Sequence, residues 1–180
     1  MEAKRLGDNA VTEGWAMLME HLVDDPAWLN RRLDVTGVAK LANAGATALL
    51  YFVRRYSAKL LYEIELFQTD DVKAMQPRYA ELLTEALKLP ANHESYLDDV
   101  DGSYYVTEYL RSWAFEAQLR DFLRSEFGTD WFARREAGGL LRELWSLGQK
   151  PTADELLRDV TGARLELGAV TDRIREGLSA

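Results

Sequence analysis

The sequence of 180 residues contains no cysteine. This absence excludes a disulfide scaffold, a metal site built on thiolates and a cysteine nucleophile, and it suits a reducing cytoplasm. Histidine is almost as scarce, because His21 and His93 are the only two. No His-Glu-x-x-His motif is present, so the sequence does not predict a catalytic zinc site that is complete within this chain.

Long apolar runs and a leader peptide are also lacking. The longest weakly charged run, residues 38–53, contains Lys40 and is followed by Arg54 and Arg55. It is too short and too interrupted to span a bilayer. The first nine residues, MEAKRLGDN, have no apolar segment of the kind that a signal peptide needs. We therefore expect a soluble, cytoplasmic protein that does not bind membranes.

Clusters of basic residues are missing as well. The formal net charge is −8 and the isoelectric point is about 4.9, so the chain as a whole repels phosphate backbones and is not expected to bind nucleic acid. The sequence has no Gly-x-Ser-x-Gly motif and no glycine-rich phosphate loop. It therefore predicts neither a serine-hydrolase elbow nor a nucleotide-binding loop.

The residues that are abundant favour helices. Apolar residues make up 47% of the chain, and only 4 prolines and 12 glycines interrupt it, which is typical of long packed helices. No alternating strand pattern of any length occurs. We predict an all-α fold, a multi-helix orthogonal bundle, over a single domain at residues 1–180. The expected helices cover about 9–23, 35–67, 69–89, 103–128, 130–134, 137–149, 152–162 and 169–178. We expect Thr69 and Ser103 to cap the helices that they begin, and Thr152 with Glu155 to form a capping box.

Glu13 lies early in the first expected helix, whose apolar face carries Trp15, Leu18, Met19 and Leu22. A glutamate in a first turn is favoured by the helix dipole and needs no further role. Alternatively, it is a metal ligand whose partner ligands lie elsewhere.

Glu20 and His21 lie seven and eight residues further along that helix, a rise of roughly 10–12 Å. Ligands of one zinc ion each lie about 2 Å from the metal. Glu13 and His21 therefore cannot share a metal on an unbroken helix, and we predict that His21 hydrogen-bonds a metal ligand or a neighbouring helix.

Three tyrosines follow the irregular segment PANHESYLDDVDGS. Tyr105, Tyr109 and Trp113 are spaced four apart and share one helix face, which by default indicates core packing. Tyr104 lies elsewhere, near the expected helix N-terminus. There its phenol either packs in the core or an interface, or donates a hydrogen bond to a developing oxyanion.

Three segments carry a resemblance to a known family. LGDNAVTEGWAMLMEHL resembles the segment after the zinc helix in helical His-Glu-x-x-His metallopeptidases, where a glutamate supplies the third zinc ligand. DGSYYVTEYLRSWAFEAQLRDFLRSEFG is similar to the tyrosine-bearing helix of the thimet oligopeptidase and oligoendopeptidase F group. AGGLLRELWSLGQ with TADELLRDVTG resembles the closing segment of that group. The angiotensin-converting enzyme and carboxypeptidase Taq groups share the helical architecture and are alternatives.

The resemblance implies roles for particular residues. Residues 1–25 would form the helix with the zinc ligand, and residues 91–128 the substrate loop and tyrosine helix. The metal ligand would be Glu13. The donors to the tetrahedral intermediate would be Tyr104 with Tyr105 or Tyr109, the substrate-binding residues His93 and Asp101, and the residues that position the ligand Asp8, Asn9 and His21.

The chain departs from the family in two respects. The zinc-binding histidines and the general-base glutamate are absent, and in the family they lie on a preceding helix that would end shortly before Met1. His93 is the one candidate for the family's substrate-loop histidine, and it aligns only with a gap.

We therefore expect the C-terminal part of a zinc-dependent peptidase, inactive alone and dependent on an N-terminal segment or subunit that carries the zinc helix. The alternative is a helical interaction or scaffold module that forms a homodimer. A third interpretation is a small-ligand site built on Arg54, Arg55, Glu63 and Glu65, although these four residues would also serve to pair neighbouring helices.

Overall fold

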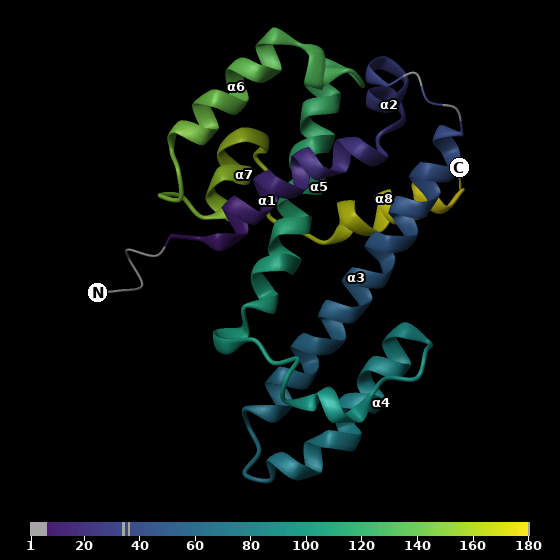
Figure 1. The fold of residues 1–180 in the computed structure, drawn as a ribbon. Coiled ribbons are helices and arrows are strands. Elements are labelled where there is room, and N and C mark those ends of the chain that lie inside the picture. Colours follow the sequence, from purple (N-terminus) through teal and green to yellow (C-terminus); the bar gives the residue numbers. More distant parts are fainter. Residues whose placement is uncertain (1–6, 34, 36, 180) are drawn as a thin grey trace. The chain divides into compact units, whose positions relative to one another are not determined.

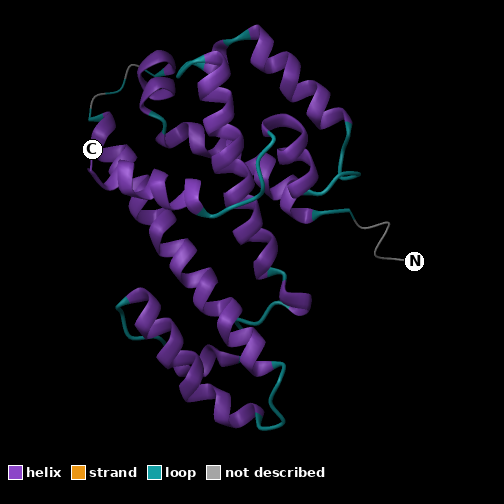
Figure 2. Ribbon diagram, turned by 180° about the vertical axis from the view of Figure 1, so that it is seen from behind, coloured by secondary structure: helices purple, strands orange, loops and turns teal. Residues whose placement is uncertain are grey.

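A computed structural model describes residues 7–33, 35 and 37–179, and these residues form helices and no strand (Figures 1 and 2). The prediction of an all-α fold is confirmed. The helices are α1 (Asn9–Glu20), α2 (Pro26–Arg32), α3 (Val38–Leu66), α4 (Met75–Leu87), α5 (Val106–Phe127), α6 (Arg135–Ser146), α7 (Ala153–Thr161) and α8 (Gly168–Ser179). No helix in the described ranges is both long enough and apolar enough to cross a membrane.

The chain divides into two compact units. Unit 1 comprises Met1–Thr47 with Arg111–Ala180, and unit 2 comprises Ala48–Leu110. Residues 1–6 of the expected ligand helix at 1–25 lie outside the described residues. The expectation of one domain over residues 1–180 stays a prediction.

The core of unit 1 explains the glycine beside Glu13. A Cβ atom on Gly14 would lie 2.5 Å from Cδ1 of the Phe115 ring on α5. Only a glycine therefore lets α1 approach this ring so closely. Trp15 extends the contact, because its ring meets Phe115 edge to face at 5.2 Å and Trp145 of α6 at 6.0 Å.

The core of unit 2 lies between α4 and the part of α3 from Ala48 onward. Tyr62 is fully buried, meets Tyr79 edge to face at 5.0 Å, and donates a hydrogen bond of 2.7 Å to the carbonyl oxygen of Tyr96. The other buried residues of this cluster are Ala58, Leu66, Met75, Leu82 and Leu83.

Several predicted helix ends are wrong by a few residues. The first helix ends at Glu20, and a 3₁₀ turn, His21–Asp24, follows it. Asp25 then caps α2 by accepting the N–H groups of Ala27 and Trp28. In α3 the first residue is Val38, and the nearby positions 34 and 36 lie outside the described residues.

The expected cap at Thr69 is also wrong. A 3₁₀ turn, Val72–Ala74, comes first and is capped by Asp71, and α4 starts only at Met75. By contrast, the predicted capping box of α7 is confirmed, since Thr152 and Glu155 each accept a backbone N–H of the other.

Candidate functional site

A pocket of about 500 Å³ in unit 2 gathers aromatic and charged side chains from α3, α5 and the loop before α5. Its walls are Tyr51, Phe52, Arg55, Tyr56, Lys59, Asp99, Asp101, Tyr105 and Tyr109. The Tyr109 ring packs edge to face against two other rings of the pocket. The distance between ring centroids is 5.2 Å to Tyr56 and 5.5 Å to Tyr105. We call it the tyrosine pocket.

The polar side of the tyrosine pocket is an ion-pair network between α3 and the loop. Lys59, only 5% exposed, donates to Asp101 at 2.7 Å and lies 3.5 Å from Asp99. A terminal nitrogen of Arg55 lies 2.9 Å from both carboxylate oxygens of Asp99. Tyr79 of α4 donates to the same carboxylate at 2.7 Å. Asp99 therefore holds the loop against α3 and α4.

The Tyr79 phenol is a fixed donor in this network. Burial, and next its hydrogen bond to Asp99, raise the pKa of Tyr79 above the ordinary value for a tyrosine. The phenol therefore keeps its proton at neutral pH, and the Asp99 carboxylate keeps this partner.

Beneath the network lies Glu63, which is fully buried. Its Oε1 atom accepts the backbone N–H of Asp101 at 2.9 Å, while its Oε2 atom has no hydrogen-bond partner among the described residues. Burial raises the pKa of Glu63, although the Asp101 N–H and Lys59 oppose this shift. Glu63 thus fixes the backbone of Asp101, and Lys59 fixes the side chain of Asp101.

These contacts decide the interpretation of the charged residues on α3. Arg54 donates to the carbonyl oxygen of Ala86, and Glu65 accepts two hydrogen bonds, of 2.7 and 2.8 Å, from Arg78. Together with the Arg55 and Glu63 contacts, they confirm that these residues pair with neighbouring elements. Arg55 also lines the tyrosine pocket.

The structure brings together three of the five tyrosine and substrate residues expected from the resemblance. Tyr105, Tyr109 and Asp101 line the tyrosine pocket. Tyr104 lies outside its walls, half-buried, with its ring edge to face on Phe67 at 5.2 Å. His93 is exposed at the start of the 3₁₀ turn His93–Tyr96. The role of Tyr104 as a donor to an oxyanion stays a prediction.

Ser103 was expected to cap the tyrosine helix, and this is wrong. Its backbone is left-handed, with φ of 58°, and Tyr104 follows with φ of 55°. Asp101 precedes this 3₁₀ turn, Gly102–Tyr104, and α5 begins at Val106. A left-handed conformation costs a residue with a Cβ atom roughly 1–2 kcal/mol, so the turn that presents the tyrosines is strained.

Replacing Ser103 by glycine is therefore expected to stabilise the protein by about 1 kcal/mol, because glycine adopts positive φ without this cost. Urea unfolding followed by circular dichroism measures the change. Gly102→Ala is the matched control: Gly102 has no positive φ, and a Cβ atom there meets nothing within 4 Å. A Ser103→Gly protein that is less stable than the parent would contradict the strained turn.

Glu13 lies in unit 1, half-buried on α1 and next to the buried Gly14. The N-cap of α1 is Asp8, which accepts the N–H of Ala10 at 3.0 Å. Asp8 also accepts two hydrogen bonds from Arg111 of α5, of 2.9 and 2.7 Å, and the N–H of Ala153 of α7 at 2.9 Å. Asp8 thus fixes the start of α1, the helix that carries Glu13, against α5 and α7.

The remaining expected residues of unit 1 lie at the two ends of α1. Asn9 is its first residue, and the Asn9 carbonyl oxygen accepts the hydroxyl of Thr12. His21 comes after the last residue of α1 and lines a different pocket, described below. Among the described residues, no three His, Cys, Asp or Glu side chains gather in a way that holds a metal ion. A zinc ion at Glu13 would need ligands from another source.

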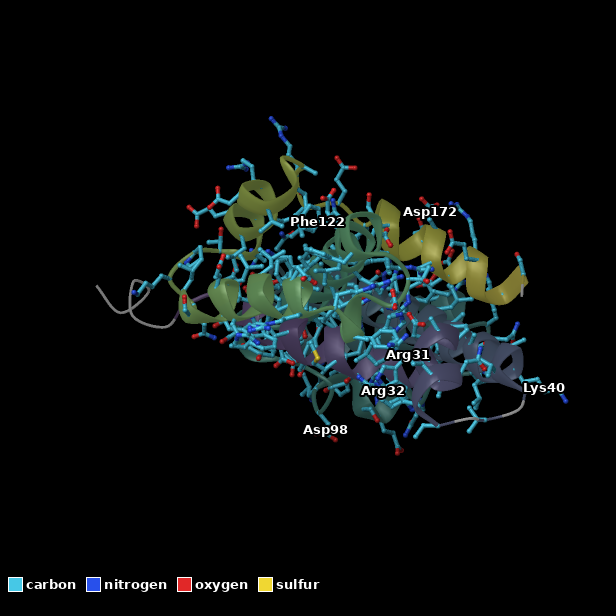
Figure 3. The ribbon with its side chains drawn as sticks, turned by 90° about the horizontal axis from the view of Figure 1, so that it is seen from above. Arg31, Arg32, Lys40, Asp98, Phe122 and Asp172 are labelled. Carbon is cyan, nitrogen blue, oxygen red and sulfur yellow. The ribbon has the colours of Figure 1, made fainter. Side chains whose placement is uncertain are left out.

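Reasoning from the sequence missed Lys59, Asp99 and the aromatic residues Tyr51, Phe52 and Tyr56. One signal for the first two was present: Arg55 and Lys59 are four apart on a helix, and the acidic loop 98–101 offers them carboxylates. Asp98 of that loop is exposed (Figure 3). Its neighbour Asp99 is the residue that makes the contacts.

The chain matches no protein-family model, no curated protein and no solved structure. The described residues define an all-α protein. It has an aromatic pocket, and the helix α1, which carries Glu13, is anchored at its start by Asp8. The family resemblance rests on the sequence motifs.

Proposed function

We propose that this chain is the C-terminal part of the catalytic domain of a helical zinc metallopeptidase that hydrolyses peptides. The observation that carries the proposal is the tyrosine pocket. From motif resemblance, Tyr105 or Tyr109 is expected to donate to the tetrahedral intermediate and Asp101 to bind substrate, and all three line one pocket. We assign the protein to the cytoplasm, since a chain without cysteine suits a reducing compartment.

The chemistry of the pocket fits a peptide. Its volume lies within the usual range of small-ligand sites, which combine aromatic walls with a few fixed polar groups. The aromatic rings offer apolar surface to a side chain. Lys59 and Asp101, held by each other at 2.7 Å, offer a donor and an acceptor at the edge. Peptide carbonyl oxygens and N–H groups are the partners that such a pair recognises.

Glu13 is the zinc ligand in this proposal, with the two histidines and the general-base glutamate supplied by a segment that carries His-Glu-x-x-His. Bound zinc lowers the pKa of a water molecule, so that hydroxide is available near neutral pH. The contribution of this chain is to hold Glu13 in place. Asp8 anchors the start of α1, and Gly14 seats the helix on Phe115.

The test uses this chain joined to the segment encoded immediately upstream of it. We expect the longer protein to bind one zinc ion and to hydrolyse fluorogenic peptides. Glu13→Gln is expected to weaken zinc binding at least about tenfold, since even residues that only support a ligand contribute 10–100-fold. Zinc content by mass spectrometry and competition with a chelator measure the change.

The matched control is Glu20→Gln, which removes an exposed carboxylate from the same helix. It is expected to leave zinc affinity unchanged. A longer protein that binds zinc equally well with Glu13→Gln would refute the ligand assignment. A longer protein without zinc and without peptidase activity would refute the enzyme.

A helical interaction module that forms homodimers is the second candidate, and one observation favours it. Unit 2 exposes several large apolar side chains, among them Leu61 at 54%, Phe67 at 51% and Leu89 at 60%. Exposed apolar surface of this kind often marks a contact with another protein. A concentration-dependent dimer in analytical ultracentrifugation, together with absence of zinc and activity in the longer protein, would establish this candidate instead.

A further inference from the structure

A second pocket, of about 200 Å³, lies in unit 1 and is lined by three arginines. Arg120 and Arg124 come from α5, and Arg173 comes from α8. The other lining residues are His21, Asp24, Asp25, Pro26, Ala42, Ala46, Glu176 and Gly177. We call it the arginine pocket.

Two of the three guanidinium groups share one buried carboxylate. Glu116 is 1% exposed, and its two oxygens accept hydrogen bonds from Arg120 at 3.2 Å and from Arg173 at 2.9 Å. Burial raises the pKa of Glu116 to about 7, against the opposing effect of Arg120. Arg120 lies a further 3.5 Å from Asp121, whose side chain is 55% exposed.

Not every guanidinium N–H donor of this cluster has an acceptor among the described residues. Burial lowers the pKa of Arg173 to about 9, although the negative charge of Glu20 opposes this shift. Arg124 is half-buried, and its side chain makes no hydrogen bond or ion pair with any described residue, although its charge acts to lower the pKa of Asp121. Each guanidinium carries five N–H donors, so these three groups have many more donors than Glu116 and Asp121 can accept.

Three carboxylates also line the arginine pocket, and each is limited as a partner. The Asp25 side chain accepts the N–H groups of Ala27 and Trp28 at the start of α2. Burial, with a smaller contribution from Glu20, raises the pKa of Asp24. Glu176 is exposed. None of the three makes an ion pair with the arginines within the described ranges.

We infer that the arginine pocket binds a small oxyanion, a phosphate or a carboxylate group, between Arg124, Arg173 and Arg120. Guanidinium groups match the oxygens of such groups with paired N–H donors. Since one water molecule occupies about 30 Å³ of liquid, the volume admits one such group with several water molecules. The site is independent of the tyrosine pocket and of Glu13.

The test is titration calorimetry of the full chain with inorganic phosphate and, separately, with acetate, at an ionic strength held constant with sodium chloride. We expect one saturable site for at least one of the two ions, with a dissociation constant of about 1 mM or lower. If phosphate alone binds, the ligand is a phosphate group, and if acetate competes with it, the site also accepts carboxylates.

Arg124→Gln is expected to weaken this binding at least about tenfold, and Arg124→Lys to weaken it less, since lysine keeps the charge but loses the paired donors. Because the Arg124 side chain makes no hydrogen bond or ion pair with a described residue, neither change is expected to unfold the protein, and circular dichroism checks this. Arg135→Gln, at an exposed position of α6, is the control and should leave binding unchanged.

Two results would overturn the inference. One is the lack of saturable heat with either ion up to about 10 mM, ten times the expected dissociation constant. The other is binding that Arg124→Gln and Arg135→Gln reduce equally, since that would be a general effect of surface charge.

Discussion

Replacing Asp8 by alanine is expected to destabilise unit 1 by about 3 kcal/mol, because one carboxylate that is only 7% exposed joins three helices. It caps α1 and binds Arg111 of α5 with both oxygens, at 2.9 and 2.7 Å. It also accepts the N–H of Ala153 at the start of α7. The substitution would leave that N–H and a partly buried guanidinium without these acceptors. Urea unfolding followed by tryptophan fluorescence measures the loss.

Asp154 supplies the matched control. It lies 3.1 Å from the same guanidinium group of Arg111, but its side chain is 44% exposed. Ion pairs at such positions contribute about 0–1 kcal/mol, so Asp154→Ala should change the free energy of unfolding little. Equal losses for Asp8→Ala and Asp154→Ala would show that the charge of Arg111, and not the buried junction of three helices, carries the stability.

Tyr62→Ala is expected to have a similar or larger effect on unit 2, about 4 kcal/mol. Tyr62 is completely buried between α3 and α4, and truncation of a large buried aromatic residue costs 3–5 kcal/mol. Tyr62→Phe keeps the ring and loses only the hydrogen bond to Tyr96, so it should cost about 1 kcal/mol. Similar losses for the two variants would mean that the hydroxyl, and not the ring, carries the stability.

The distribution of tryptophan lets one experiment assign the effect to a unit. All five tryptophans of the chain lie within the ranges of unit 1, at positions 15, 28, 113, 131 and 145. Unit 2 contains none. We expect Tyr62→Ala to shift the transition seen by circular dichroism more than the one seen by tryptophan fluorescence. If both signals shift together, the chain unfolds as a single cooperative unit.

Much of the fold was predictable because its signals are local. The helical periodicity of apolar residues and the absence of alternation gave the all-α class. The capping box at Thr152 was recognised because both of its hydrogen bonds span three residues. Predicted helix ends were wrong where the backbone adopts another local conformation. At Ser103, for example, a left-handed residue stands in place of the expected cap.

The candidate site was predictable only in part. Asp101, Tyr105 and Tyr109 were named from motif resemblance, and they share a pocket. Lys59 and Asp99 were not named. A lysine on a helix usually stays in solvent, so there was no reason from sequence to place Lys59 in a buried contact with an aspartate. Its burial depends on two aspartates that lie about 40 residues further along the chain.

The sequence by itself determined which segments are helical and which residues have chemistry to offer, since periodicity and capping act between residues a few positions apart. The tertiary structure decided which of these residues meet. Asp8 and Arg111 are 103 positions apart, and nothing local to either predicts their pairing. Likewise, Gly14 is explained only by the Phe115 ring against which it lies. Contacts between helices depend on the path of the whole chain, and a pattern that spans only a few residues does not determine that path.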